Sequence, residues 1–267
     1  MNPENALSVE PDTDNEVKPK RKGIYLLPNL LTTGCLFSGF YAIVAAIDQH
    51  FAPAGMAVFV AMIFDTLDGR IARLTRTESA FGKEYDSLAD MVSFGLAPAI
   101  VAYQWGVVRI MEYGQFWGRF GWLACFFYAA AAALRLARFN VRAAADKRYF
   151  EGLPSPSAAA IVAAFVWFSS KWEEPGLTGL IAAFIVTASA GALMVSRFGY
   201  PSFKQFSLDR RIKFIYMLFV LLFFVAIAID PPTMLLSMFG VYALSAPILW
   251  LGRRIRRLLR GAPVAGG

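Results

Sequence analysis

Long apolar segments alternate with short polar segments along most of the chain. Two of the clearest apolar runs are 122–134 and 214–229, and other runs approach this length once their flanks are included. An α-helix needs about 20 predominantly apolar residues to cross the ~30 Å hydrocarbon core of a membrane. Division of the chain at polar and turn residues predicts eight such helices. They cover residues 27–48, 51–75, 86–108, 117–143, 155–171, 175–196, 211–229 and 232–255.

The composition is that of a membrane protein. Hydrophobic residues make up 57% of the chain and charged residues 17%, whereas a soluble domain has ~45–50% apolar residues and about a quarter charged residues. We therefore predict an all-α, polytopic integral membrane protein. Pro98 lies within the third predicted helix and predicts a kink there. Cys35 and Cys125 lie inside apolar segments and are expected to be small buried side chains rather than a disulfide or a metal site.

Lys and Arg are unevenly distributed among the polar segments. The N-terminal flank, the loops after the second, fourth and sixth helices, and the C-terminal tail are rich in basic residues, whereas the other loops have few or none. Because cytoplasmic segments carry the excess of Lys and Arg, this alternation predicts that both chain ends are cytoplasmic. The net charge of +7 is then explained by helix ends that attract anionic membrane lipid, and we expect no nucleic-acid partner.

The same pattern divides the chain into three regions. Residues 1–22 are predicted to be a disordered tail with a basic end, because the acidic and polar start offers no apolar stretch for a signal peptide. Residues 23–255 form the predicted transmembrane domain. Residues 256–267 continue an arginine-rich segment with interleaved apolar residues, which is typical of a helix at a lipid surface.

Four aspartates mark the junction between the second and third predicted helices. Asp65 and Asp68 are three residues apart and Asp86 and Asp90 are four apart, so each pair shares one helix face. The short connection favours antiparallel neighbours whose acidic faces meet. Four converging carboxylates would repel one another strongly without a cation, and oxygen ligands suit magnesium, manganese or calcium. The pattern therefore predicts a site for one or two divalent ions, of the kind that binds phosphates.

Two other interpretations of these aspartates remain open at this point. Carboxylates near a helix end can be solvated or paired with nearby arginines, here Arg70, Arg73 and Arg76. They can also bind the cargo of an ion or metal transporter, whose site would lie near the bilayer centre between broken helices. The aspartates instead border a basic loop. In addition, Gly69 leaves room beside the carboxylates for a substrate, with Arg73 placed for its phosphate.

The segment from Asp65 to Asp90 fits the pattern Asp-x2-Asp-Gly-x2-Ala-Arg-x8-Gly-x3-Asp-x3-Asp. It resembles the signature of the CDP-alcohol phosphatidyltransferases. The resemblance implies a six-helix core around a metal site that opens to the cytoplasm (in a bacterium, at the inner membrane), so that the last two predicted helices are additions. It also implies that Asp65, Asp68 and Asp86 bind Mg²⁺ or Mn²⁺, and that Asp90 is both a metal ligand and the general base.

The same resemblance implies that CDP-diacylglycerol is the phosphatidyl donor. The residues expected at its head group are Asn29, Thr32, Gly69, Arg73, Ser79 and Gly82. In the expected reaction an alcohol attacks the phosphorus that bears diacylglycerol, and CMP leaves. The single histidine, His50, lies in a loop predicted on the opposite side of the membrane, so a carboxylate is the expected base.

The acceptor alcohol is suggested by two further segments. Residues 86–98, and 134–140 followed by 150–156, resemble the branch of the family that uses L-serine. A serine carboxylate requires a cation, and we expect Arg135 or Arg138, with Ser93, to bind it, although such arginines also serve as membrane anchors. The metal site itself is equally compatible with glycerol 3-phosphate, an inositol phosphate or choline. A homodimer is one assembly that we consider, since the sequence does not determine the oligomeric state.

Overall fold

The computed structural model describes residues 26–142, 150–172, 176–200 and 214–260. Its α-helices are α1 (Leu26–Ile47), α2 (Phe51–Thr75), α3 (Ala80–Asp90), α4 (Ala97–Trp105), α5 (Gln115–Arg142), α6 (Ser155–Ser169), α7 (Leu177–Val195), α8 (Phe214–Ile229) and α9 (Pro231–Arg260). The π-helical segment η2 (Met91–Leu96) joins α3 to α4, and the 3₁₀ segment η3 (Val107–Tyr113) follows α4. The short strands β1 (Phe150–Glu151) and β2 (Gly199–Tyr200) pair antiparallel.

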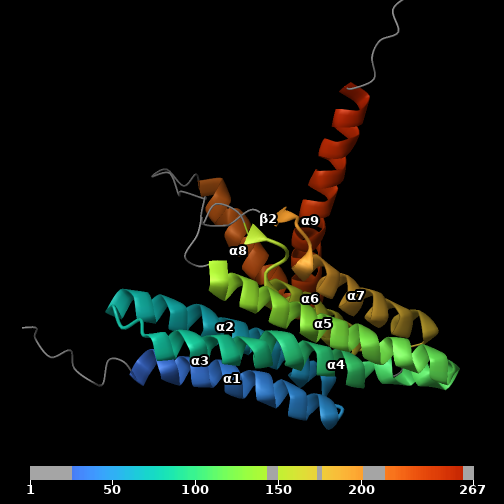
Figure 1. Cartoon of the computed structure of the whole chain (residues 1–267), viewed down its shortest axis with the longest axis horizontal. Helices are drawn as coiled ribbons and strands as arrows, with labels where there is room; N and C mark the ends of the chain where they lie inside the picture. Colours follow the sequence, from blue (N-terminus) through green and yellow to red (C-terminus); the bar gives the residue numbers. More distant parts are fainter. Residues whose placement is uncertain (1–25, 143–149, 173–175, 201–213, 261–267) are drawn as a thin grey trace, which may run out of the picture.

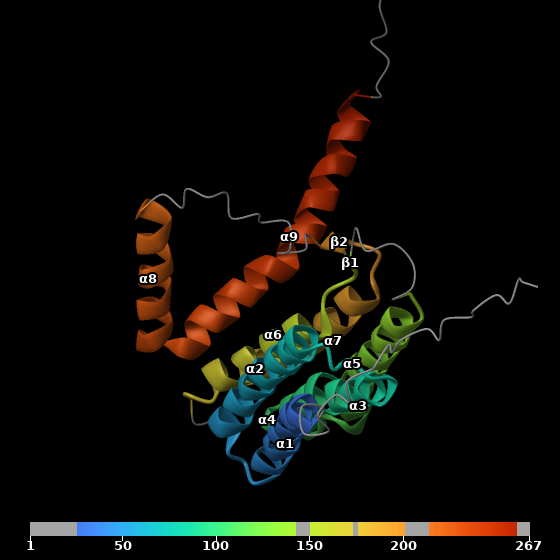
Figure 2. The same cartoon turned by 90° about the vertical axis from the view of Figure 1, so that its left-hand side faces the viewer.

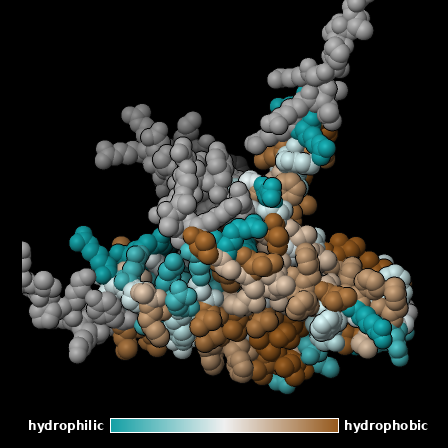
Figure 3. All heavy atoms as spheres, viewed as in Figure 1, coloured by the Kyte–Doolittle hydropathy of each residue, from teal (hydrophilic) through white to brown (hydrophobic). Residues whose placement is uncertain are grey.

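The structure confirms a polytopic, nearly all-helical membrane protein. Five helices within the described ranges, α1, α2, α5, α7 and α9, are long and apolar enough to cross a membrane. The third predicted helix corresponds to α3, η2 and α4, which form one helical run that begins at Ala80 rather than at residue 86. Helix α6 is apolar but has only 15 residues. The hydrophobic surface forms a broad region across the bundle, with hydrophilic residues gathered toward its ends (Figure 3). The number of spans, eight, remains a prediction.

Helices α1 to α7 lie alongside one another (Figure 1). Helix α9 contacts α6, and its C-terminal part extends away from the bundle (Figure 1). Small residues line the places where the helices meet. An added Cβ at Gly55 on α2 would lie 2.9 Å from the Ala163 carbonyl oxygen of α6, and one at Gly34 on α1 would lie 3.1 Å from the Phe64 ring of α2. Small side chains of this kind let membrane helices approach closely, because packing replaces the hydrophobic effect between helices in lipid. Cys35 and Cys125 are buried free thiols within this packing, as the sequence predicted.

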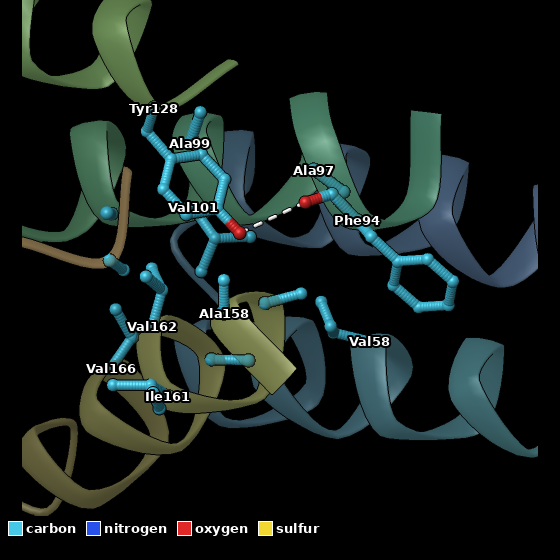
Figure 4. Packing of buried hydrophobic residues seen from close by; sticks show 14 of the residues in the cluster. Val58, Phe94, Ala97, Ala99, Val101, Tyr128, Ala158, Ile161, Val162 and Val166 are labelled. Atoms are coloured by element: carbon cyan, nitrogen blue, oxygen red, sulfur yellow. Dashed lines mark hydrogen bonds between the residues drawn. The ribbon is translucent and has the colours of Figure 1, made fainter. Parts of the chain in front are cut away.

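The irregularity predicted at Pro98 takes the form of the π-helical segment η2, directly before this proline. In an α-helix the Phe94 carbonyl would accept a hydrogen bond from residue 98, and proline has no N–H to donate. The fully buried Tyr128 of α5 donates to the Phe94 carbonyl instead, at 3.0 Å (Figure 4). The helical run after Asp90 is therefore held in place by α5.

Two contacts join loops that were predicted to lie on the same side of the membrane. Lys171, after α6, forms a 2.7 Å ion pair with Asp230, between α8 and α9. The hydrogen bond from Lys171, and to a smaller extent that from Thr233, holds the pKa of the Asp230 carboxyl below its usual range. At the opposite ends of the helices, β1 pairs with β2, so the segment before α6 lies against the segment after α7. Both contacts agree with the alternation of basic loops.

The predicted terminal regions are described only in part. Residues 1–22 lie outside the described residues, so the structure does not bear on the predicted tail. Helix α9 continues to Arg260 and thus extends into the region from residue 256 that was predicted as a basic tail. Near this end the Arg254 guanidinium lies 5.2 Å from the centre of the Trp250 ring.

Candidate metal and phosphate site

Three of the four predicted aspartates converge between α2 and α3. Asp65 and Asp68 come from α2 and Asp86 from α3, and each offers a carboxylate oxygen that lies within 4.8 Å of the other two. Asp68 is buried, whereas Asp65 and Asp86 are half-buried. Three like charges at this distance destabilise one another unless a cation or a proton lies between them. The convergence that the sequence spacing predicted is therefore present in the fold.

The turn between α2 and α3 is defined by its capping residues. Arg76 ends α2 in the left-handed conformation, with φ of 53°, and its N–H bonds to the carbonyl oxygens of Ala72 and Arg73. Ser79 caps α3, because its Oγ accepts a 2.9 Å hydrogen bond from the Gly82 N–H. This compact connection brings the two acidic helix ends together. Ser79, predicted at the substrate head group, thus also has a structural role.

Helix α1 adds a buried hydroxyl to the acidic cluster. Thr32 Oγ1 donates a 2.8 Å hydrogen bond to Asp68 Oδ2, and the same oxygen lies 3.1 Å from the Pro28 carbonyl oxygen. The sequence placed Thr32 at the nucleotide but did not indicate this contact with Asp68. No local pattern encodes it, since the two residues are separated by 36 positions and meet only when α1 packs on α2.

Asp90 lies one helical turn beyond Asp86, at the end of α3. Its Oδ1 is buried and has no hydrogen-bond partner among the residues that the structure describes. A buried carboxylate oxygen without a partner is strongly destabilising, so such atoms indicate a ligand, an ion or a role in proton transfer. A divalent cation with oxygen ligands fits this set of donors, three convergent carboxylates and a fourth with an unpaired buried oxygen. Segment η2 begins directly after Asp90, and π-helical turns are frequent at functional sites.

The predicted phosphate-binding residues lie at the same helix ends. Arg73 Nε donates a 2.7 Å hydrogen bond to the Gly69 carbonyl oxygen, and the Arg73 side chain is exposed. A Cβ added at Gly69 would meet only the far end of Arg73, at 3.8 Å, so space remains beside Asp68. Across the cluster, a Cβ at Gly82 would lie 3.4 Å from Asn29 Oδ1. Asn29 of α1 and Gly82 of α3 are therefore neighbours.

The three residues predicted to bind the acceptor differ in their surroundings. Arg135 of α5 donates from Nη1 to Ser155 Oγ at 2.9 Å, and its Nε is buried with no hydrogen-bond partner in the described part of the chain. Its guanidinium interacts electrostatically with Asp90. Arg138 lies exposed one turn further along α5. Ser93 is fully buried and donates a 3.0 Å hydrogen bond to the Cys35 carbonyl oxygen, so its hydroxyl joins η2 to α1.

Comparison with known proteins identifies the family. Residues 25–196 match the CDP-alcohol phosphatidyltransferase family. Over 232 residues the chain is 38% identical to the CDP-diacylglycerol–serine O-phosphatidyltransferase of Helicobacter pylori. The alignment covers 85% of this chain and 92% of that protein. The chain belongs to the CDP-alcohol phosphatidyltransferase family.

More distant members of this family also match. The chain is 35% identical over 175 residues to the CDP-diacylglycerol–serine O-phosphatidyltransferase of Saccharomyces cerevisiae, over 60% of each chain. It is 36% identical over 178 residues to the archaetidylserine synthase of Methanothermobacter thermautotrophicus, over 66% of this chain and 69% of that protein. Membership of the family confirms the resemblance seen in Asp65–Asp90, and it favours an enzyme over a transporter. The family match ends at residue 196, before α8 and α9.

Proposed function

We propose that this chain transfers the phosphatidyl group of CDP-diacylglycerol to the hydroxyl of L-serine, giving phosphatidylserine and CMP. The observation that carries the chemistry is the convergence of Asp65, Asp68 and Asp86 within 4.8 Å, next to the unpaired buried oxygen of Asp90. The choice of serine is supported by the relatives, since the Helicobacter pylori protein that is 38% identical over 85% of this chain is named for transfer to serine.

The acidic cluster would hold one or two Mg²⁺ or Mn²⁺ ions, with Asp65, Asp68, Asp86 and Asp90 as ligands. When bound, such an ion neutralises charge on the diphosphate and makes its phosphorus more electrophilic. Thr32 orients the Asp68 carboxylate through its 2.8 Å hydrogen bond, as residues behind the ligands of a metal site commonly do.

The head group of CDP-diacylglycerol would lie over the ends of α1, α2 and α3. The space beside Gly69 admits the diphosphate, and the exposed Arg73 guanidinium is placed to bind one of its phosphates. The nucleotide side of the head group would contact residues at the neighbouring helix ends. These are Asn29, Thr32, Ser79 and Gly82.

The transfer itself needs one proton acceptor and one leaving group. Asp90 takes the proton of the serine hydroxyl, whose oxygen forms a bond to the phosphorus that bears diacylglycerol. The bond between this phosphorus and the bridging oxygen of the diphosphate breaks, and CMP leaves with that oxygen and its electron pair. The proton then passes from Asp90 to solvent, so the carboxylate is restored for the next turnover.

Arg135, Arg138 and Ser93 are the proposed ligands of the serine carboxylate, and Arg135 has the geometry that supports this role best. Its guanidinium interacts with Asp90, and its buried Nε is unpaired within the described residues. Choline, which has no carboxylate, would make no use of this cation. Glycerol 3-phosphate and inositol phosphates carry anionic groups, so they are the acceptors against which serine has to be compared.

The proposed topology has eight spans, with both chain ends and the active site on the cytoplasmic side. It is supported by the alternation of basic loops and by the two contacts that join loops on the same side, the Lys171–Asp230 pair and the β1–β2 pair. Residues 23–255 would then form one transmembrane domain between terminal tails.

A panel of acceptors tests the proposed function directly. The purified protein is supplied with CDP-diacylglycerol, Mg²⁺ or Mn²⁺, and one alcohol at a time, and both CMP and the lipid product are measured. We expect CMP release that depends on serine and on the metal, with phosphatidylserine as the product, and loss of both with Asp86→Asn. Turnover with another alcohol but not with serine contradicts serine as the acceptor. Metal flux across vesicles without CMP release contradicts the assignment as an enzyme.

A further inference from the structure

Helix α9 lies outside the residues that match the family, yet it packs against α6, whose first residue accepts a hydrogen bond from Arg135. The family match ends at residue 196, and α9 covers Pro231–Arg260. It contacts α6, the helix that begins at Ser155, and also strand β2. Figure 2 shows α9 passing beside α6 and β2, between the bundle and α8. An added membrane anchor would not need to contact α6.

One side chain of α9 interacts with the proposed serine ligand. The Tyr242 phenol and the Arg135 guanidinium interact electrostatically, and Arg135 interacts in the same way with Asp90. Arg135 also donates its Nη1 hydrogen bond to Ser155 Oγ at 2.9 Å. The guanidinium therefore lies among groups from three different helical elements, which are α3, α6 and α9.

The position of Tyr242 is well defined by its neighbours. Its ring lies against the ring of Tyr200, with 5.4 Å between the centroids and 47° between the planes. Tyr200 is fully buried and donates a 2.9 Å hydrogen bond to the Ala243 carbonyl oxygen. Ala243 and Ala246 are themselves buried. Strand β2 thus holds this turn of α9 in place, and with it the Tyr242 phenol near Arg135.

We propose that Tyr242 is a positioning residue, which orients the Arg135 guanidinium toward the acceptor's carboxylate and makes α9 part of the acceptor site. A guanidinium has five N–H donors in a rigid plane, so the bond to Ser155 fixes the direction of one donor. The electrostatic interaction with the Tyr242 phenol favours one orientation of that plane. A cation held in its binding geometry before the substrate arrives loses less entropy on binding. This inference depends on the proposed function, because it assumes that the acceptor carries a carboxylate.

Steady-state kinetics of Tyr242→Phe test the inference, since this variant keeps the ring and its packing on Tyr200 but removes the hydroxyl. We expect the KM for serine to rise about tenfold, as for loss of a polar interaction with a charged group. The KM for CDP-diacylglycerol should stay within about twofold of the wild-type value, because the hydroxyl acts on the acceptor alone. A KM for serine in Tyr242→Phe that equals the wild-type value overturns the proposal.

A double-mutant cycle with Arg135→Lys shows whether Tyr242 acts through Arg135. If it does, Tyr242→Phe raises the KM for serine much less in the Arg135→Lys background than in the wild-type background. If the two substitutions instead raise this KM independently, so that their fold-changes multiply in the double variant, Tyr242 does not act through Arg135. Phe239→Leu is the control on the same helix, since the Phe239 ring packs on the Phe59 ring, with 6.2 Å between the ring centroids. An equal rise in Phe239→Leu would reduce Tyr242 to a packing residue and overturn the proposal. Wild-type protein without serine-dependent CMP release would instead contradict the proposed function.

Discussion

The hydroxyl of Tyr128 donates a 3.0 Å hydrogen bond to the carbonyl oxygen of Phe94, the group that Pro98 leaves without its α-helical partner. Both side chains are fully buried. The contact ties α5 to η2, and η2 follows Asp90 directly. One hydroxyl therefore compensates for a proline and restrains the helix that carries the proposed general base.

Replacement of Tyr128 by phenylalanine should lower stability with little change in packing. The substitution leaves the buried Phe94 carbonyl without the hydroxyl donor, and an unsatisfied buried group destabilises by about 1–3 kcal/mol. Thermal unfolding of the purified protein in detergent measures the effect, with Tyr103→Phe in the neighbouring helix α4 as the matched control. Identical unfolding temperatures for Tyr128→Phe and the wild type would show that the hydroxyl contributes nothing to stability.

The close approach of α1 and η2 depends on Gly39. A Cβ at this position would lie 2.4 Å from Ser93 Oγ and 2.7 Å from Ser93 Cα, so Gly39→Ala forces the two helices apart. We expect a loss of about 1–3 kcal/mol in unfolding free energy, as for other overpacked interiors. The control is Gly240→Ala in α9, where the added Cβ would meet no described atom within 4 Å. That change should be neutral or stabilising, because alanine favours a helix, and equal losses in the two variants contradict the packing argument.

Asp90 is expected to be indispensable for turnover. Asp90→Asn keeps the shape of the side chain but removes the proton acceptor, and loss of general-base catalysis lowers kcat by roughly 10²- to 10⁴-fold. The control is Glu84→Gln, which removes an exposed carboxylate from the same helix and should keep the wild-type kcat. The measurement is CMP release at saturating serine and metal. More than a tenth of wild-type kcat in Asp90→Asn would assign the base to another group.

The acidic cluster could be predicted from the sequence because its information is local. The spacing of Asp65, Asp68 and Asp86 and the short connection between their helices determine which faces meet, and the structure brings them within 4.8 Å. The start of α3 was predicted six residues too late, because the N-cap at Ser79 was interpreted only as a substrate contact. Polar residues that begin a membrane helix carry a weak hydropathy signal.

Contacts between distant segments were not predictable in the same way. The Thr32–Asp68 bond, the Tyr128–Phe94 bond and the interaction of Tyr242 with Arg135 each join residues that are not neighbours in the sequence and lie on different helical elements. Such pairs depend on helix rotation and depth in the bundle, which hydrophobic patterns leave undetermined when a helix is apolar on all sides. The family resemblance covered the core of the site but gave no indication of a role for α9.

Thr32 offers a test of whether α1 contributes to metal binding at the proposed site. Thr32→Val keeps the shape of the side chain but removes the 2.8 Å hydrogen bond to Asp68, whose carboxylate then loses its orientation. Because residues behind metal ligands commonly change metal affinity by about 10- to 100-fold, we expect the Mn²⁺ concentration for half-maximal activity to rise about tenfold. Thr32→Ser retains the hydroxyl and should stay near the wild-type value. Thr33→Val is the adjacent control, since the exposed Thr33 bonds to Tyr85 at 3.0 Å and not to the cluster. An unchanged Mn²⁺ requirement in Thr32→Val, or the same shift in Thr33→Val, would contradict a role for the Thr32–Asp68 bond in metal binding.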